Sequence, residues 1–535
     1  MPPPEPAPEG RSESAAWFGR PAILTQITSG VVLRGLLFVA IFSLAAVPPL
    51  DPDLWWHLAN GRLIIATGSI PHVDVYSFSA AGQPWVMHEW LADLGMYGLF
   101  RLGGLPLLVG VFAAVVTASA GCLFWLLRRS GVQPAAAVVL TLIGALAGST
   151  AWGARPQLLN VLFAGVLMIG LLRYRDGQLR SWMLPPYIWV WANLHSGFVV
   201  GVIIGGLFVA GEAIDIWRAS PQAMPRPRLL SLAVAIAASI PLSVINPFGI
   251  ATLLFAVGTL TSPLIQNNIQ EWASPDFHSL AGLLFEGLVF LMLAGLATRR
   301  VALRSSEWVL AFALLYLAFS SQRHVPLFVL CAAPLYGRCA QALLALVASL
   351  PNASNARIAR KRGSPGPAGA PRRGRVKLGG NPLLGLVNLV VLLVVGAGMV
   401  GDRAMPNLQP ATEAAAISGA LPVHVSDALA SLGRPVRVFN YYDYGGYLVW
   451  RLFPSGGRVY IDGRVEVYGT RIFANYLQVN YVGDGWRSVI AQARPDAILL
   501  PTGHPLVRLL QQDAEWQQFS RDPVSTVFIR VGFAP

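Results

Sequence analysis

Two aspartates, Asp51 and Asp53, directly follow the first long apolar segment of the chain. Carboxylates in this D-x-D spacing can offer oxygen ligands to a divalent cation such as Mg²⁺ or Mn²⁺. A cation held there would neutralise a phosphate leaving group. The structural alternative is a polar helix end in which Asp51 and Pro52 form a turn. Trp56 and His57 favour chemistry, because an indole ring can stack on a sugar and His57 shares a helical face with Asp53 if the stretch is helical.

Other polar groups occur in segments far along the chain. Glu89 suits a general base or a metal ligand, or else the negative charge at the start of a helix over 90–101. His195 lies in a predicted break at Asn193–Gly197, where a hydrogen-bonded structural histidine is the alternative. Arg323 could pair with a phosphate through its planar guanidinium, or serve as a basic interfacial residue. Such groups are costly at a membrane boundary unless they are solvated or paired, so we expect one polar cavity that opens outward.

The composition indicates a polytopic membrane protein. Of the 535 residues, 54% are hydrophobic and 12% are charged, whereas a soluble protein carries roughly 25% charged residues. This excludes a soluble enzyme, a disordered chain and a fibrous protein. Apolar segments of about 20 residues can cross a bilayer, and eleven candidates are present: 31–50, 104–127, 134–153, 157–172, 183–192, 198–217, 229–246, 280–297, 308–321, 325–346 and 381–400. The short segment 183–192 predicts a half-helix before the break.

Basic residues set the expected orientation, because Lys and Arg concentrate on the cytoplasmic side of a membrane. They predict a disordered cytoplasmic tail (1–30), a membrane domain (31–346) with an outer first loop (51–103), a basic cytoplasmic loop (347–380), a last span (381–400) and a periplasmic domain (401–535). This pattern accounts for the net charge of +13 without a nucleic-acid partner. The basic loop could also bind anionic lipid.

Residues 401–535 alternate short strands with helices, which predicts a soluble α/β domain. Strands are expected at 436–440, 458–461, 497–501 and 526–531, and helices near 424–432, 470–481, 485–493 and 505–513. Asp462 and Gly463 predict a hairpin turn, so Asp462 and Arg464 are interpreted as turn residues. Tyr441–Trp450 could be a strand end, a Gly-Gly turn and an amphipathic helix on the membrane. The three cysteines lie in apolar segments and predict neither a disulfide framework nor a zinc site.

Two motifs resemble the GT-C superfamily of integral-membrane glycosyltransferases. Asp51–Asp53 follows the first helix as the family's acidic motif does, and Asn440–Gly445 is similar to the W-W-D-Y-G motif of the oligosaccharyltransferase catalytic subunit. Four patches look still more like an uncharacterised bacterial glycosyltransferase-like branch: 51–61, 191–197, 441–450 and 461–464. Tyr441 and Tyr442 replace the two tryptophans, so sequon recognition is not implied. The family's second acidic pair has no counterpart near Ala154–Gln157, so the resemblance does not by itself imply a metal.

The resemblance implies a GT-C-like fold of about eleven membrane helices and a polyprenyl-phosphate sugar donor. We expect inverting transfer to a glycan, lipid or protein acceptor at the outer face of a bacterial cytoplasmic membrane, with membrane lipid as a further partner. Asp53 is the expected general base or metal ligand, supported by Asp51, with Glu89 the third candidate catalytic residue. The other expected substrate-binding residues are Trp56, His57, His88, His195, Glu271, Arg323, His324, Tyr442 and Asp443.

Other functions stay open at this point. The chain could bind or flip a lipid-linked sugar without catalysis, act as an envelope-assembly scaffold, or be a polysaccharide ligase or polymerase. ATP-driven transport is disfavoured, because no Walker loop is convincing in the sequence.

Overall fold

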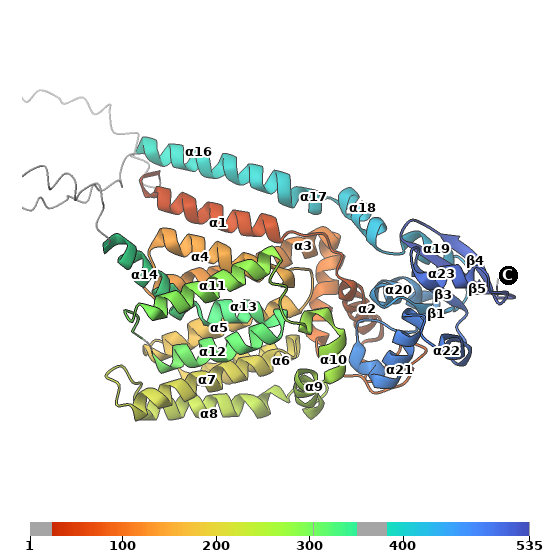
Figure 1. The fold of residues 1–535 in the computed structure, drawn as a ribbon, viewed down its shortest axis with the longest axis horizontal. Coiled ribbons are helices and arrows are strands. Elements are labelled where there is room, and N and C mark those ends of the chain that lie inside the picture. The colour runs from red at the N-terminus through yellow and green to blue at the C-terminus, as the bar shows by residue number, and fades with distance from the viewer. Residues whose placement is uncertain (1–23, 303, 350–381, 534–535) are drawn as a thin grey trace, which may run out of the picture.

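The computed structural model describes residues 24–302, 304–349 and 382–533. Most of the predicted tail (1–30) and of the basic loop (347–380) lies outside the described residues. The described chain is mostly helical, and Figure 1 shows a bundle of long helices joined at one end to a smaller region of strands and short helices.

A helix occupies each apolar segment that was predicted to span a membrane. The helices of the bundle are α1 (Ser29–Ala45), α3 (Trp90–Arg129), α4 (Pro134–Ala147), α5 (Gln157–Arg175), α6 (Leu184–Leu194), α7 (Phe198–Trp217), α8 (Arg226–Ser243), α11 (Leu280–Ala297), α12 (Ser305–Ser320), α13 (Val325–Cys331), α14 (Ala333–Ser349) and α16 (Pro382–Met399). By length and composition, five helices can cross a membrane, or six if the bent pair 322–349 is one span. The fold is therefore that of a helical membrane protein.

Two interruptions in the bundle follow from local sequence. Helix α3 is kinked at Gly103 and Gly104, and Gly104 has a φ of 66°, which a residue without Cβ adopts readily. The predicted break after residue 192 is confirmed: α6 ends at Leu194, His195 is extended, and α7 begins at Phe198. Because the backbone leaves the helix at His195, that imidazole is free to point away from the axis of either helix.

Three short helices lie where the bundle meets the C-terminal region: α2 (Pro52–Thr67), α9 (Ile250–Thr261) and α10 (Pro263–Asn268). The short 3₁₀ segment Gln270–Trp272 follows α10, and another, Gln322–His324, joins α12 to α13. Pro52 at the first turn of α2 and Pro263 at the first turn of α10 suit helix starts, where the missing N–H has no helical partner.

The C-terminal region contains a mixed five-stranded sheet. Its strands are β1 (Arg437–Asn440), β2 (Arg458–Val459), β3 (Ala497–Pro501), β4 (Trp516–Arg521) and β5 (Ser525–Arg530), in the order β2-β1-β3-β5-β4. Strand β1 runs parallel to β2 and β3, whereas β5 is antiparallel to β3 and β4. The helices are α17 (Met405–Asn407), α18 (Pro410–Ala420), α19 (Val423–Ala430), α20 (Gly445–Leu452), α21 (Val465–Asn480), α22 (Trp486–Ala493) and α23 (Pro505–Leu510).

The predicted hairpin at Asp462–Gly463 is wrong. Strand β2 ends at Val459 and the chain enters helix α21 at Val465, so no second strand follows the turn. The reason is tertiary: Asp462 and Arg464 are buried in an ion-pair cluster with Asp74 of the first loop, which holds this segment away from a strand ladder. Strand β4 was not predicted, because its edge position leaves most of its side chains exposed or half-buried.

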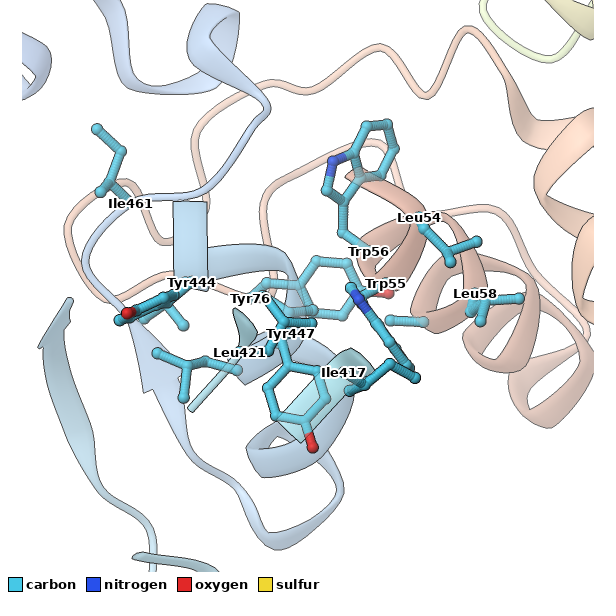
Figure 2. Close-up of a cluster of buried hydrophobic side chains, with 14 of the residues drawn as sticks. Leu54, Trp55, Trp56, Leu58, Tyr76, Ile417, Leu421, Tyr444, Tyr447 and Ile461 are labelled. Atoms are coloured by element: carbon cyan, nitrogen blue, oxygen red, sulfur yellow. The ribbon is translucent and has the colours of Figure 1, made fainter. Parts of the chain in front are cut away.

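Helix α2 lies between the bundle and the C-terminal region (Figure 1). Trp55 packs edge-on against Tyr447 of α20, with ring centroids 5.0 Å apart, and Figure 2 shows Ile417 and Leu421 in the same cluster. Helix α20 thus rests on α2, which corrects its interpretation as a membrane-surface helix. The first loop also extends the sheet, because Val459 of β2 exchanges backbone hydrogen bonds with Tyr76 and Phe78. One continuous core therefore joins the C-terminal region to the part of the bundle around α1 to α4, and a second core fills the rest of the bundle.

Candidate active site

Asp51 and Asp53 begin helix α2, and their side chains do different things. Asp51 caps the helix: its Oδ1 accepts a hydrogen bond from the Asp53 N–H at 2.9 Å. Asp53 Oδ1 accepts a hydrogen bond of 2.9 Å from the Trp56 indole, while Oδ2 has no hydrogen bond or ion pair to any described residue. Burial and the neighbouring Asp51 charge raise the pKa of Asp53 to about 7. A carboxylate with that pKa and an uncommitted oxygen suits a general base at neutral pH.

Arg155 joins two of the predicted carboxylates. Its Nε lies 3.2 Å from Asp51 Oδ2, and its Nη1 forms an ion pair with Glu271. The Arg155 guanidinium also holds the pKa of Glu271 below its ordinary value, against the effect of burial. A fixed positive charge therefore stands between the Asp51 and Glu271 carboxylates.

These donors fit a resident divalent cation poorly. Asp51 spends one oxygen on the helix cap and the other on Arg155, which leaves Asp53 Oδ2 as the free carboxylate oxygen of the D-x-D pair. Within the described ranges, no group of three or more His, Cys, Asp and Glu side chains is placed to hold a metal ion. No step of the chemistry below depends on a metal.

Glu89 is surrounded by three imidazoles. His195 Nε2 lies 2.9 Å from its Oε1, and the Nε2 atoms of His88 and His57 lie 3.6 and 3.7 Å from its Oε2. Burial would raise the pKa of Glu89, but His88, His195 and His57 together hold it well below its ordinary value. Glu89 is thus an ionised orienting group, and Asp53 is the better base.

The tautomer of His195 follows from its other ring nitrogen. Nδ1 accepts a hydrogen bond from the Gly197 N–H at 2.8 Å and lies 3.0 Å from the Asn160 amide nitrogen. The Asn160 orientation is fixed because its Oδ1 accepts the Trp191 indole N–H at 2.7 Å. The proton of a neutral His195 is therefore on Nε2, where it is donated to Glu89.

A second chain of polar groups lies behind His57. Its Nδ1 is 2.6 Å from Asp93 Oδ1, and Asp93 Oδ2 accepts a hydrogen bond from Asn60 at 2.7 Å. Burial would lower the pKa of His57, but the Asp93 and Glu89 carboxylates raise it to about 9. Asn60 and Asp93 were not predicted. Helical spacing could have identified both residues, because Asn60 lies three residues after His57 and Asp93 lies four residues after Glu89.

A cavity with about 680 Å³ of empty space adjoins this cluster. Its polar lining comes from Gln157, Asn160, His195, Ser196, Thr259, Arg323 and His324, and Trp191 and Trp272 are among its apolar walls. The Arg323 guanidinium stacks over Trp272 at 4.5 Å. The carboxylates of Glu271, Glu89 and Asp53 lie near enough to Arg323 for their charges to act on it. Five segments distant in sequence line this cavity, but Asp53, Glu89 and Glu271 are not among its lining residues.

Two of the predicted substrate-binding residues differ in their placement. Tyr442 joins the cluster, since its hydroxyl reaches the Gly463 carbonyl at 3.4 Å and Gly463 lies against Asp53. Asp443 is exposed beside Tyr441 and contacts none of the described carboxylates or imidazoles of the cluster. His88 packs its ring on Phe255, with centroids 4.2 Å apart, and burial lowers its pKa to about 4.

Arg464 ties the first loop to the C-terminal region beside this site. Its guanidinium forms hydrogen bonds to Asp462 at 2.8 and 2.6 Å, and its Nη1 lies 2.9 Å from Asp74 Oδ1 in an ion pair that is not aligned as a hydrogen bond. All three side chains are fully buried. The sequence interpretation of Asp462 and Arg464 as turn residues is therefore wrong, since both are buried in an interdomain ion cluster.

The fold is similar to that of a solved oligosaccharyltransferase. The archaeal oligosaccharyltransferase AglB from Archaeoglobus fulgidus, solved with an inhibitory peptide and a dolichol-phosphate, aligns with a TM-score of 0.51 at 10% identity, over 88% of this chain and 69% of its own. ArnT from Cupriavidus metallidurans aligns at 16% identity over 94% of this chain and 98% of its own, with TM-scores of 0.49 for the apo state and 0.44 for the undecaprenyl phosphate complex. The chain thus has a GT-C-type fold. No protein-family model and no curated protein matches it.

Proposed function

We propose that this protein is an inverting glycosyltransferase that moves a sugar from a polyprenyl-phosphate donor to an acceptor hydroxyl. The observation that carries the proposal is a polar cluster beside a cavity. Arg155 pairs Asp51, next to Asp53, with Glu271. The residue after Glu271, Trp272, stacks under Arg323, and both line the cavity. Asp53 offers a free carboxylate oxygen with a pKa of about 7, and Arg323 offers a cation for the donor phosphate. The likeness to AglB, a transferase solved with a dolichol-phosphate, supports the same class.

The reaction follows from these positions. Asp53 Oδ2 takes the proton of the acceptor hydroxyl as its oxygen attacks the anomeric carbon of the sugar. The bond from that carbon to the phosphate oxygen breaks, and the polyprenyl phosphate leaves with the electron pair. Arg323 stabilises the charge that develops on the leaving phosphate. Glu89, His57 and His195 hold the donor and Asp53 in the relative positions that the attack requires.

An apolar cavity suits the lipid part of the donor. It has about 440 Å³ of empty space between α3, α4, α5 and α13, and it shares Ala151 and Val161 with the polar cavity. Its walls are almost entirely apolar, including Val116, Leu123 and Leu330. A polyprenyl chain can lie there while its phosphate reaches Arg323.

The finer topology belongs to the same proposal. The chain would cross a bacterial cytoplasmic membrane eleven times, with the N-terminus in the cytoplasm and the active site and C-terminal region in the periplasm. The acceptor would be an envelope glycan, lipid or protein. The competing function is non-catalytic binding of a lipid-linked sugar, for which Asp53 would not need to titrate.

Mass spectrometry of envelope glycans and polyprenyl-linked lipids tests the proposal in a deletion strain. The strain is complemented with the wild type, Asp53→Asn, or Asp484→Asn, which makes the same change at an exposed loop carboxylate. We expect a lipid-linked sugar to accumulate in the deletion and with Asp53→Asn at matched membrane levels, and to be consumed with the other two. If Asp53→Asn complements fully, catalysis by Asp53 is refuted and the binding function takes its place.

A further inference from the structure

A second polar cavity, separate from the one that holds Arg323, lies between the bundle and helix α21. It is open to solvent and has about 1060 Å³ of empty space, and its walls come from α9, α10 and the first turns of α21. Figure 1 shows α10 beside α21 at the junction of the two regions. Its polar lining residues are Thr259, Ser262, Asn267, Asn268, Glu466 and Thr470.

Glu466 is the single charged residue among the described residues that line this cavity. Its side chain is exposed to the cavity and makes no hydrogen bond or ion pair with another described residue. Its carboxylate oxygens are therefore available for hydrogen bonds to a ligand, and they would repel an anionic one.

The cavity adjoins the catalytic cluster through helix α9. Thr259 lines this cavity and the Arg323 cavity alike. Phe255, another wall residue, stacks on His88, whose Nε2 lies 3.6 Å from Glu89. A ligand in the second cavity is therefore one side chain away from the groups that surround Glu89, on a face of α9 that adjoins the Arg323 cavity.

The two cavities differ in charge. The first contains Arg323 and suits an anionic phosphate, whereas the second contains one carboxyl group, two amides, three hydroxyls and apolar walls that include Phe255, Leu264 and Ile265. Carboxyl, amide and hydroxyl groups beside an aromatic face match the hydroxyls and the apolar face of an uncharged sugar. A phosphorylated ligand would meet no cation among these lining residues and would be repelled by an ionised Glu466.

We propose that the cavity between α9, α10 and α21 binds the acceptor as an uncharged sugar, with Glu466 holding its hydroxyls. The identification of the bound sugar as the acceptor rests on the proposed function. The presence of a sugar-binding site in this cavity does not. Glu466 is a specificity residue in this scheme, and Asp53 remains the base.

Saturation-transfer NMR on the full chain in lipid nanodiscs tests the sugar site. The probes are uncharged disaccharides (cellobiose, maltose and chitobiose) and glucose 6-phosphate. The variants are Thr470→Trp, which fills the cavity from an exposed helical position, and Glu466→Gln. Glu515→Gln is the matched control, because Glu515 is an exposed carboxylate that does not line this cavity. Binding of undecaprenyl phosphate, followed by native mass spectrometry, reports on the donor cavity.

We expect at least one uncharged disaccharide to bind the wild type and the control, and glucose 6-phosphate to bind neither. Glu466→Gln should weaken sugar binding about tenfold, the loss of one hydrogen bond to a charged group, and Thr470→Trp should weaken it more. Undecaprenyl phosphate binding should be unchanged in both variants. The proposal is overturned if no uncharged disaccharide binds, if glucose 6-phosphate binds better, or if Thr470→Trp binds sugar normally. Sugar binding that depends on Thr470 in a protein that transfers no sugar would instead refute the transferase function alone.

Discussion

The backbone of Gly463 lies directly against the carboxylate of Asp53, so that a Cβ atom at residue 463 would overlap Asp53 Oδ1 and crowd the Trp56 indole. Asp53 begins a helix next to the bundle, and Gly463 belongs to the C-terminal region. The C-terminal region therefore forms one wall of the candidate active site, and the position of the base depends on both parts of the chain.

Gly463→Ala should sharply reduce sugar transfer without unfolding the protein. The added methyl group must displace Asp53, and a displacement of about 1 Å can cost about 100-fold in rate. Gly503→Ala is the matched control, because a Cβ there meets open space. Transfer rates and thermal melting of the purified variants decide the matter. A normal rate for Gly463→Ala would show that Asp53 need not hold this position.

The pKa of Asp53 predicts the pH dependence of the reaction. Because a general base must be deprotonated, the rate should fall as the pH drops through about 7. Asp53→Asn should reduce the rate by about 10³-fold, within the usual range for general-base catalysis, and remove this pH dependence. A flat profile in the wild type between pH 5 and 8 would argue against Asp53 as the base.

The raised pKa of Asp53 also predicts how the stability of the folded protein depends on pH. The transfer rate should rise with pH, whereas the stability should fall. The folded protein binds the Asp53 proton more tightly than the unfolded chain, whose aspartate titrates near 3.8. The contribution of the protonated Asp53 to stability is therefore complete below about pH 4 and is lost as the pH rises through about 7. Asp53→Asn should raise the Tm more at pH 8 than at pH 5. An equal change at both pH values would contradict the raised pKa.

Arg464→Ala should separate the C-terminal region from the first loop. The substitution leaves Asp74 and Asp462 buried without their cation, and breaking a buried pair in this way costs about 3–5 kcal/mol. Arg487→Ala, which removes an exposed partner of Asp513, should cost at most about 1 kcal/mol. Thermal melting and limited proteolysis compare the two variants. Equal stabilities would mean that the buried cluster does not hold the two parts together.

Chelation tests whether a divalent cation takes part. Since Asp51 is committed to the helix cap and to Arg155, we expect EDTA to leave the transfer rate of the purified protein unchanged. Arg155→Gln should lower the rate, because Asp51 and Glu271 then lose their shared positive charge. Loss of activity in EDTA with recovery in Mg²⁺ or Mn²⁺ would restore the metal-binding interpretation of Asp51 and Asp53.

The sequence by itself determined the membrane class, the helical segments and the break at His195, because apolar length and local breakers act over a few residues. It also identified Asp53, Glu89, His195 and Arg323 as candidate residues from their unusual polar context. It could not assign the partners of those groups. Arg155 and Asp51 lie about a hundred residues apart, and Asp93 reaches His57 only when α3 packs on α2.

Only the tertiary structure distinguished the role of Asp51 from that of Asp53. The D-x-D spacing does not distinguish Asp51 from Asp53. In the folded chain Asp51 forms an ion pair with Arg155, whereas Asp53 keeps one carboxylate oxygen without a partner among the described residues. The turn at Asp462–Gly463 was misread for the same reason, since a local Asp-Gly signal carries no information about the burial of Arg464 against Asp74. Charge pairing depends on distances in space, and a linear sequence records those distances only where helical or strand spacing fixes them.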